Sequence, residues 1–285
     1  MTILKKRRLR AARIAKENGF GALAFVPGPN FFYLTGLDFH LMERPTILFV
    51  PSDGEILAII PELERSRWRD VFPDAVTFFW QDSDGFDLAF SSCAKSLIGR
   101  IGVEGMRMRM FEFEALSENF PRGALSNSEV EISELRICKD TTEINNLKKA
   151  IEISEAALFD LIENAHAGDT EAELASRLKQ AMLVRGAQSF GFDPIVLSGP
   201  NTADPHGTSG QRSIAPGEPL LIDFGASFGG MNADITRTFF CEHASDHSRA
   251  IYATVLEANT KGKNVAGPGV TCDRIDRETT KLLTN

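Results

Sequence analysis

The first hundred residues alternate between short apolar runs and segments whose apolar residues recur at helical spacing. The apolar runs have the length of β-strands and lie at 22–26, 46–50, 55–60 and 101–103. Turn-forming residues at 51–54 separate the second and third runs, so residues 46–60 are predicted to form a β-hairpin. Helical patterns flank the strands at 3–18, 62–70, 86–99 and 108–119. The pattern predicts an α/β domain at the N-terminus.

Between Pro121 and Ser133 the sequence becomes polar and the hydrophobic periodicity fades. We therefore expect a domain boundary here, with one domain over residues 1–130 and a second over 131–285. The total length of 285 residues agrees with two domains of ordinary size.

Two amphipathic helices are predicted to open the second domain. Each begins with a side-chain acceptor that is followed three residues later by a glutamate, first Asp140 with Glu143 and then Thr170 with Glu173. Beyond residue 190 the hydrophobic period changes to two. This change predicts a strand at 193–197, a hairpin of 220–226 with 231–240, and then helices at 246–262 and from 271. The second domain is therefore expected to be α+β.

The predicted hairpin carries two aspartates. If residues 227–230 form a four-residue loop, Ala226 pairs with Met231, and Asp223 then lies directly opposite Asp234 on the same face. The Cβ atoms of such a pair are roughly 4.5–5.5 Å apart. The two carboxylates would repel each other unless a positive charge lay between them.

Several interpretations of this aspartate pair remain open at this point. The carboxylates could share a proton, bind one hard cation, or bridge two divalent ions roughly 3.5–4 Å apart. A surface hairpin whose acidic residues face water is the alternative without a function. The apolar run 220–222 directly before Asp223 is typical of a strand buried on both faces, where a charge needs a partner. The apolar run therefore argues against a surface hairpin and indicates that Asp223 has a partner.

The residues around both aspartates resemble the metal-binding hairpin of proline-specific aminopeptidases and prolidases, which belong to the creatinase and methionine aminopeptidase "pita-bread" family. The matching segments are Leu-Ile-Asp-Phe-Gly at 221–225 and Asn-Ala-Asp-Ile-Thr-Arg-Thr at 232–238. Ser198–Asn201 and Pro205–Gly207 resemble the family segment that brings a histidine to the substrate. Asn30–Gly36 resembles a stretch of the creatinase-type N-terminal domain. The resemblance covers nearly the whole chain.

The resemblance implies a creatinase-like N-terminal α/β domain beside an α+β pita-bread catalytic domain that is incomplete here. It implies two divalent metal ions, with manganese expected and cobalt or zinc as alternatives. Asp223 and Asp234 match metal ligands, and His206 matches a catalytic residue that steadies the tetrahedral intermediate or binds substrate. The family uses a further histidine and two glutamates, which we expect beyond residue 285. We therefore expect the chain to be part of a longer enzyme and to be inactive alone.

The expected function is that of a metal-dependent exopeptidase that cleaves the peptide bond before proline, either as an aminopeptidase or as a dipeptidase. Its substrate would be a proline-containing peptide, and the resemblance also implies a homodimer. One alternative is a creatinase-like hydrolase that acts on a small C–N substrate without metal. The other is a non-catalytic binding protein that keeps the fold.

The charge of the chain excludes some partners. A net charge of −8 and a pI near 5.3 argue against nucleic acid as a partner, because binding phosphates needs a positive surface. The basic cluster at residues 5–16 is predicted to form a solvated helix face. No apolar run has the length of a signal peptide or a membrane span, so we expect a cytoplasmic protein with no membrane partner.

Overall fold

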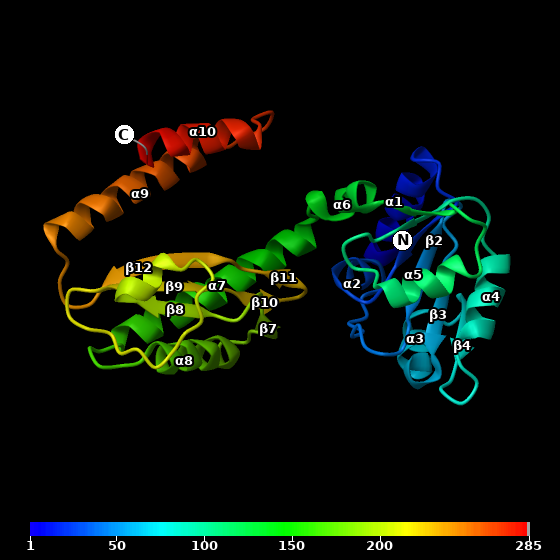
Figure 1. Ribbon diagram of the computed structural model, residues 1–285, viewed down its shortest axis with the longest axis horizontal. Helices are drawn as coiled ribbons and strands as arrows, with labels where there is room; N and C mark the ends of the chain where they lie inside the picture. The colour runs from blue at the N-terminus through cyan, green and yellow to red at the C-terminus, as the bar shows by residue number, and fades with distance from the viewer. Residues whose placement is uncertain (284–285) are drawn as a thin grey trace. The chain divides into compact units, whose positions relative to one another are not determined.

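The computed structural model describes residues 1–283, and the chain divides after Lys139 into two compact units (Figure 1). The division falls later than the expected boundary at residue 130. Helix α6 (Glu129–Ile137) spans the expected boundary and contributes Ile132 and Leu135 to the hydrophobic core of the first unit. The polar segment thus conceals an amphipathic helix that belongs to the N-terminal unit.

A six-stranded mixed sheet forms the centre of the first unit. Its strands lie in the order β4-β3-β2-β1-β5-β6. Strand β2 is antiparallel to β1 and β3, whereas the β3–β4, β1–β5 and β5–β6 pairs are parallel. The bounds are β1 (Ala22–Phe25), β2 (Ile47–Pro51), β3 (Leu57–Pro61), β4 (Val76–Trp80), β5 (Ile101–Val103) and β6 (Leu125–Asn127). The predicted hairpin at 46–60 is confirmed by the pairing of β2 with β3.

Helices cover both faces of this sheet. In β1, Leu23 and Phe25 belong to a cluster formed with residues of α1, α2, α3 and α6, whereas Ala22 and Ala24 belong to a cluster that contains residues of α4 and α5. Alternate residues of a strand point to opposite faces, so every residue of β1 is buried. The helices are α1 (Ile3–Glu17), α2 (Pro29–Thr35), α3 (Arg65–Val71), which follows a short 3₁₀ helix η1 (Glu62–Glu64), α4 (Asp87–Lys95) and α5 (Met110–Ser117).

Two arginines of the basic cluster have structural roles. Arg7 and Arg8 donate hydrogen bonds from helix α1 to the backbone oxygens of Tyr33 (3.3 Å) and Leu34 (3.1 Å). Both carbonyls lie in the last turn of α2, where cations stabilise the exposed carbonyl groups. The interpretation of this cluster as a solvated face was therefore incomplete.

Glu104 is a buried carboxyl group at the end of β5, with 1% of its surface exposed. Its Oε2 accepts a hydrogen bond from the Val26 backbone (2.8 Å), and its Oε1 accepts one from the Asn30 side chain (2.8 Å). Burial raises the pKa of Glu104 to about 7, although these hydrogen bonds and the charge of Arg107 lower it. Asn30 Oδ1 in turn accepts from Arg136 Nε of α6 at 2.7 Å.

The stability of the first unit is expected to depend on the protonation of Glu104. The folded-state pKa of about 7 lies above the ordinary value of 4.5. The contribution of protonated Glu104 to the unfolding free energy is therefore fully present below pH 4.5 and is lost as the pH rises through 7. Relative to Glu104→Gln, which cannot ionise, the wild type should lose up to about 3 kcal/mol of unfolding free energy across this window. Urea unfolding followed by tryptophan fluorescence measures this, because Trp68 and Trp80, the two tryptophans of the chain, both lie in the first unit. Parallel curves of stability against pH would contradict the prediction.

The second unit begins with the two predicted helices, α7 (Thr141–Glu163) and α8 (Glu171–Val184). Both predicted capping boxes, Asp140 with Glu143 and Thr170 with Glu173, are present. The strands that follow form two three-stranded sheets, ordered β12-β9-β8 and β11-β10-β7. Their bounds are β7 (Ser189–Phe190), β8 (Ile195–Ser198), β9 (Pro219–Phe224), β10 (Ala226–Phe228), β11 (Met231–Asn232) and β12 (Ile235–Phe240), with the 3₁₀ helix η2 (Gly199–Ala203) after β8.

One face of strand β9 is buried in the core of the second unit. Leu220, Ile222 and Phe224 pack in one cluster with residues of α7 and α8. Leu221 and Asp223 point to the other face and are half-buried. The prediction that this strand is buried on both faces was therefore wrong, and Asp223 lies on the partly open face of the sheet.

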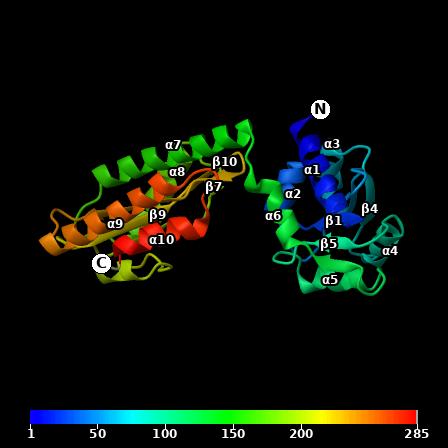
Figure 2. The same cartoon turned by 90° about the horizontal axis from the view of Figure 1, so that it is seen from above.

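Helix α9 (Asp246–Val265) lies beside α10 (Cys272–Leu283) (Figure 2). Several large apolar side chains of α9 remain more than 40% exposed, namely Ile251, Tyr252, Val255 and Leu256. Within residues 1–283, none of the helices combines the length and the apolar character that crossing a membrane requires.

Candidate metal centre and active site

The hairpin that carries the aspartates has a two-residue turn. Phe228 pairs with Met231, and between them Gly229 and Gly230 both have positive φ, at 57° and 77°. Positive φ at both central positions is the mark of a type I′ turn, whose twist matches that of the flanking strands. The predicted four-residue loop was wrong, because two adjacent glycines make the tighter turn accessible.

The tighter turn changes the partner of Asp223. Thr236 lies opposite Asp223, and Ile235 lies opposite Phe224. The same register continues in β10 and β11, which places Asp234 opposite Gly225. The prediction that the aspartates are directly opposite was therefore wrong. A register change of two residues keeps each side chain on its predicted face. Asp223 and Asp234 therefore become diagonal neighbours, whose Cα atoms are roughly 7–8 Å apart.

The strands approach each other closely between the two aspartates. A Cβ atom on Gly225 would lie 1.7 Å from the backbone oxygen of Ala233 and 2.5 Å from its carbonyl carbon. Contacts this short with backbone atoms exclude every side chain at position 225. Glycine at this position thus sets the spacing at the point where the carboxylates converge.

The two carboxylates differ in their surroundings. Asp223 is half-buried, and its Oδ1 accepts a hydrogen bond of 2.6 Å from Thr236 Oγ1. Asp234 is exposed to solvent. The Thr236 hydroxyl therefore orients the Asp223 carboxylate, while the side chain of Asp234 faces water.

This donor set fits hard divalent cations, which take carboxylate oxygens as ligands. The diagonal spacing leaves room between the carboxylates for one ion or for two ions roughly 3.5–4 Å apart. Over residues 1–283, however, no group of three or more His, Cys, Asp or Glu side chains is arranged to hold a metal. Asp223 and Asp234 could therefore form only one part of a ligand set.

His206 lies in the loop that follows η2, with an exposed side chain. Its backbone nitrogen donates to Asp204 Oδ1 at 3.0 Å. His206 lines a cleft of about 470 Å³ together with Ser176 and Lys179 of α8 and Ile195 of β8. Ile195 pairs with Asp223 across the sheet, so the cleft adjoins the strand that carries the first aspartate. In the described part of the chain, no hydrogen bond joins His206 to either aspartate.

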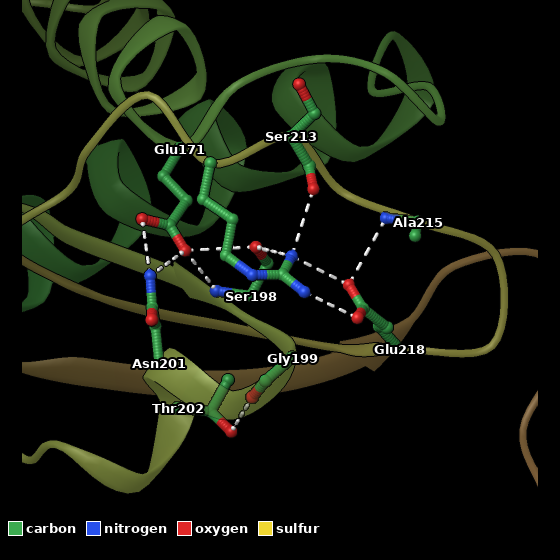
Figure 3. A network of polar contacts seen from close by, with 9 residues as sticks. Glu171, Ser198, Gly199, Asn201, Thr202, Ser213, Ala215 and Glu218 are labelled. Carbon is green, nitrogen blue, oxygen red and sulfur yellow. Dashed lines mark hydrogen bonds and ion pairs between the residues drawn. The ribbon is translucent and has the colours of Figure 1, made fainter.

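Glu171 is a buried charged residue near this loop that the sequence patterns did not reveal. It is fully buried and accepts hydrogen bonds from Ser198 and Asn201 (Figure 3). Its position directly after the N-cap Thr170 offers a sufficient local explanation, because acidic residues are common in the first turn of a helix. The sequence offered only a weak signal, namely that the chain contains both this glutamate and the Ser-Gly-Pro-Asn segment at 198–201.

Comparisons with known proteins place both units in established families. Residues 7–138 match the creatinase/prolidase N-terminal domain, and residues 145–285 match metallopeptidase family M24. Among curated proteins, the chain is 28% identical to an Xaa-Pro dipeptidase of Pyrococcus horikoshii over 276 residues, which are 97% of this chain and 76% of the relative.

Solved structures give the same result for the fold. A prolidase from Thermococcus sibiricus superposes with a TM-score of 0.90 at 30% identity, over all of this chain and 78% of that structure. An X-Pro aminopeptidase from Thermotoga maritima has a TM-score of 0.82 at 26% identity, over 97% of this chain and 77% of the other. The chain therefore belongs to metallopeptidase family M24, as a prolidase-type enzyme with a creatinase-like N-terminal domain and a pita-bread catalytic domain.

Proposed function

We propose that the chain is part of an enzyme that catalyses metal-dependent hydrolysis of the peptide bond that precedes proline. The observation that carries the proposal is the pair of carboxylates on one face of the β9–β12 hairpin, in a chain of family M24. Relatives named Xaa-Pro dipeptidase and prolidase support this choice of substrate. Short peptides with proline at the second position are the proposed substrates.

Asp223 and Asp234 are the residues proposed to hold divalent ions, for which we propose manganese. A divalent ion in such a site lowers the pKa of bound water towards neutrality and polarises the scissile carbonyl group. Thr236 fixes the orientation of the Asp223 carboxylate through its hydroxyl group. His206 is proposed to bind the substrate or to stabilise the tetrahedral intermediate, from an exposed position that a peptide can reach.

The proposed function predicts a defined pattern of cleavage. The product of the complete reading frame, stripped with a chelator and resupplied with Mn²⁺, Co²⁺ or Zn²⁺, should cleave an X-Pro dipeptide or an X-Pro-Y tripeptide and leave the matched X-Ala peptides intact. The 285-residue chain by itself should stay inactive. Liberated amino acids are measured by chromatography, for this chain and for the product of its complete reading frame. Preference for the dipeptide would indicate a dipeptidase, and preference for the tripeptide would indicate an aminopeptidase.

Two results would contradict the proposal. Hydrolysis of a small C–N substrate such as creatine by the metal-free protein would favour a creatinase-like enzyme. Absence of cleavage with every metal and peptide, in both protein lengths, would favour a binding protein that keeps the fold.

A further inference from the structure

The Glu171 carboxylate is saturated by donors from the loop that contains His206. Glu171 Oε1 accepts from the Ser198 backbone (2.7 Å), the Ser198 hydroxyl (3.0 Å) and the Asn201 side chain (3.0 Å) (Figure 3). Glu171 Oε2 accepts from the Gly210 backbone at 3.1 Å. A fully buried carboxylate with this many donors is unavailable as a base or as a metal ligand.

These donors bracket His206 in the sequence. Ser198 and Asn201 lie before it, and Gly210 lies after it, so one carboxylate fastens both ends of the loop. The first turn of α8 reinforces the closure, because the Ala172 backbone nitrogen donates to the oxygen of Gly210 at 2.9 Å. The loop is thus attached to the end of a helix that is itself anchored in the core.

An ion pair also connects the loop to the strand of the aspartates. Arg212 donates to the Ser198 hydroxyl at 3.0 Å and forms an ion pair of 2.5 Å with Glu218. The Arg212 guanidinium holds the pKa of the Glu218 carboxyl below its usual value. Glu218 directly precedes β9, which carries Asp223 five residues further on. Glu171, Ser198 and Arg212 therefore join the His206 loop to the metal-binding strand.

We infer that Glu171 is a positioning residue, which fixes the loop 198–210 so that His206 meets the substrate at a set place relative to Asp223. Glu171 acts through the loop and touches neither substrate nor metal. The part of this inference that concerns catalysis rests on the proposed function, whereas the part that concerns the loop can be tested without activity.

Hydrogen exchange of the full chain tests the loop directly. Glu171→Gln keeps the size of the side chain but replaces one carboxylate oxygen by an NH₂ group, which donates and cannot accept. This group must face the backbone N–H of either Gly210 or Ser198, so one of these hydrogen bonds is lost. Exchange at Gly210 or Ser198 should accelerate about tenfold or more, while the amides of α7 stay unchanged. Glu173→Gln, two positions further along the same turn, is the matched control and should leave the loop unchanged, because the hydrogen bonds of Glu173 join it to its own N-cap, Thr170.

Unchanged exchange throughout 198–210 in Glu171→Gln would overturn the inference. If that variant does not fold, Asn201→Ala removes a single exposed donor to the carboxylate and carries the same measurement. Unaltered exchange at Ser198 and Gly210 in a folded Asn201→Ala protein would likewise count against the inference.

A double-mutant cycle with His206→Ala tests the link to catalysis. In the product of the complete reading frame, Glu171→Gln should lower kcat/KM for an X-Pro dipeptide about tenfold, and it should have little further effect once His206 is removed. Additive losses would overturn the role of Glu171 as a positioning residue for His206. If the product of the complete reading frame cleaves no X-Pro peptide, the proposed function fails, while the exchange experiment still decides whether Glu171 fixes the loop.

Discussion

In the product of the complete reading frame, Asp223→Asn is expected to lower metal-dependent cleavage of an X-Pro dipeptide by roughly 100-fold or more, since altering even an outer partner of a metal ligand typically costs 10–100-fold. Asparagine keeps the shape of the side chain and its hydrogen bond with Thr236, but it carries no negative charge for a divalent cation. Metal content by mass spectrometry should fall together with kcat/KM. The fold should persist, because Asp223 is half-buried and its strand is anchored by the opposite face.

Two further variants distinguish the proposed role of Asp223 as a ligand from the effects of neighbouring groups. Thr236→Val removes the hydroxyl that orients Asp223 and should have a smaller effect, about tenfold. Asp276→Asn changes an exposed carboxylate of α10 and should behave as the wild type. Wild-type metal content in Asp223→Asn would rule out Asp223 as a ligand, whatever the activity.

Local signals in the sequence predicted most of the fold correctly. Capping pairs such as Thr170 with Glu173 mark helix starts through bonds within one turn, so they depend little on the rest of the chain. The buried strands of the first unit could be predicted from the sequence, because helices cover both faces of the sheet and nearly every strand position is therefore apolar. The edge strands β4 and β6 were not predicted, since Thr77 interrupts the apolar run of β4 and two of the three residues of β6, Ser126 and Asn127, are polar.

The register of the hairpin that carries Asp223 and Asp234 needed information that the hydrophobic pattern does not contain. Loops of two and of four residues give the same alternation of faces, because they differ by a register change of two residues. The pair Gly229-Gly230 was the stronger signal, since glycine tolerates the positive φ of both turn positions. The pattern therefore predicted which face carries Asp223, but not which residue lies opposite.

Glu171 could not be predicted for a different reason. Its donors lie 27 to 39 residues further along the chain and come into place only when the loop folds back on α8. The same applies to α6, whose membership of the first unit depends on long-range packing of Ile132 and Leu135. Contacts of this kind leave no periodic trace in the sequence.

Gly225→Ala is expected to destabilise the second unit by about 3 kcal/mol or more, the upper end of the range for overpacking, because the new methyl group collides with rigid backbone. The Cβ atom would lie 1.7 Å from the Ala233 oxygen, and the strands can relieve this only by separating between Asp223 and Asp234. Separation there also moves the two carboxylates apart. The variant should therefore lose metal affinity even at a temperature where it remains folded.

Urea unfolding with two signals locates the damage. The fluorescence of Trp68 and Trp80 reports only the first unit and should keep its midpoint, while the circular dichroism transition of the second unit moves to lower urea. Gly267→Ala is the matched control, because a methyl group at position 267 meets no atom within 4 Å. Equal midpoints for Gly225→Ala and Gly267→Ala would show that the hairpin accommodates a side chain between the aspartates, and the close approach of the strands would then have no part in setting the metal site.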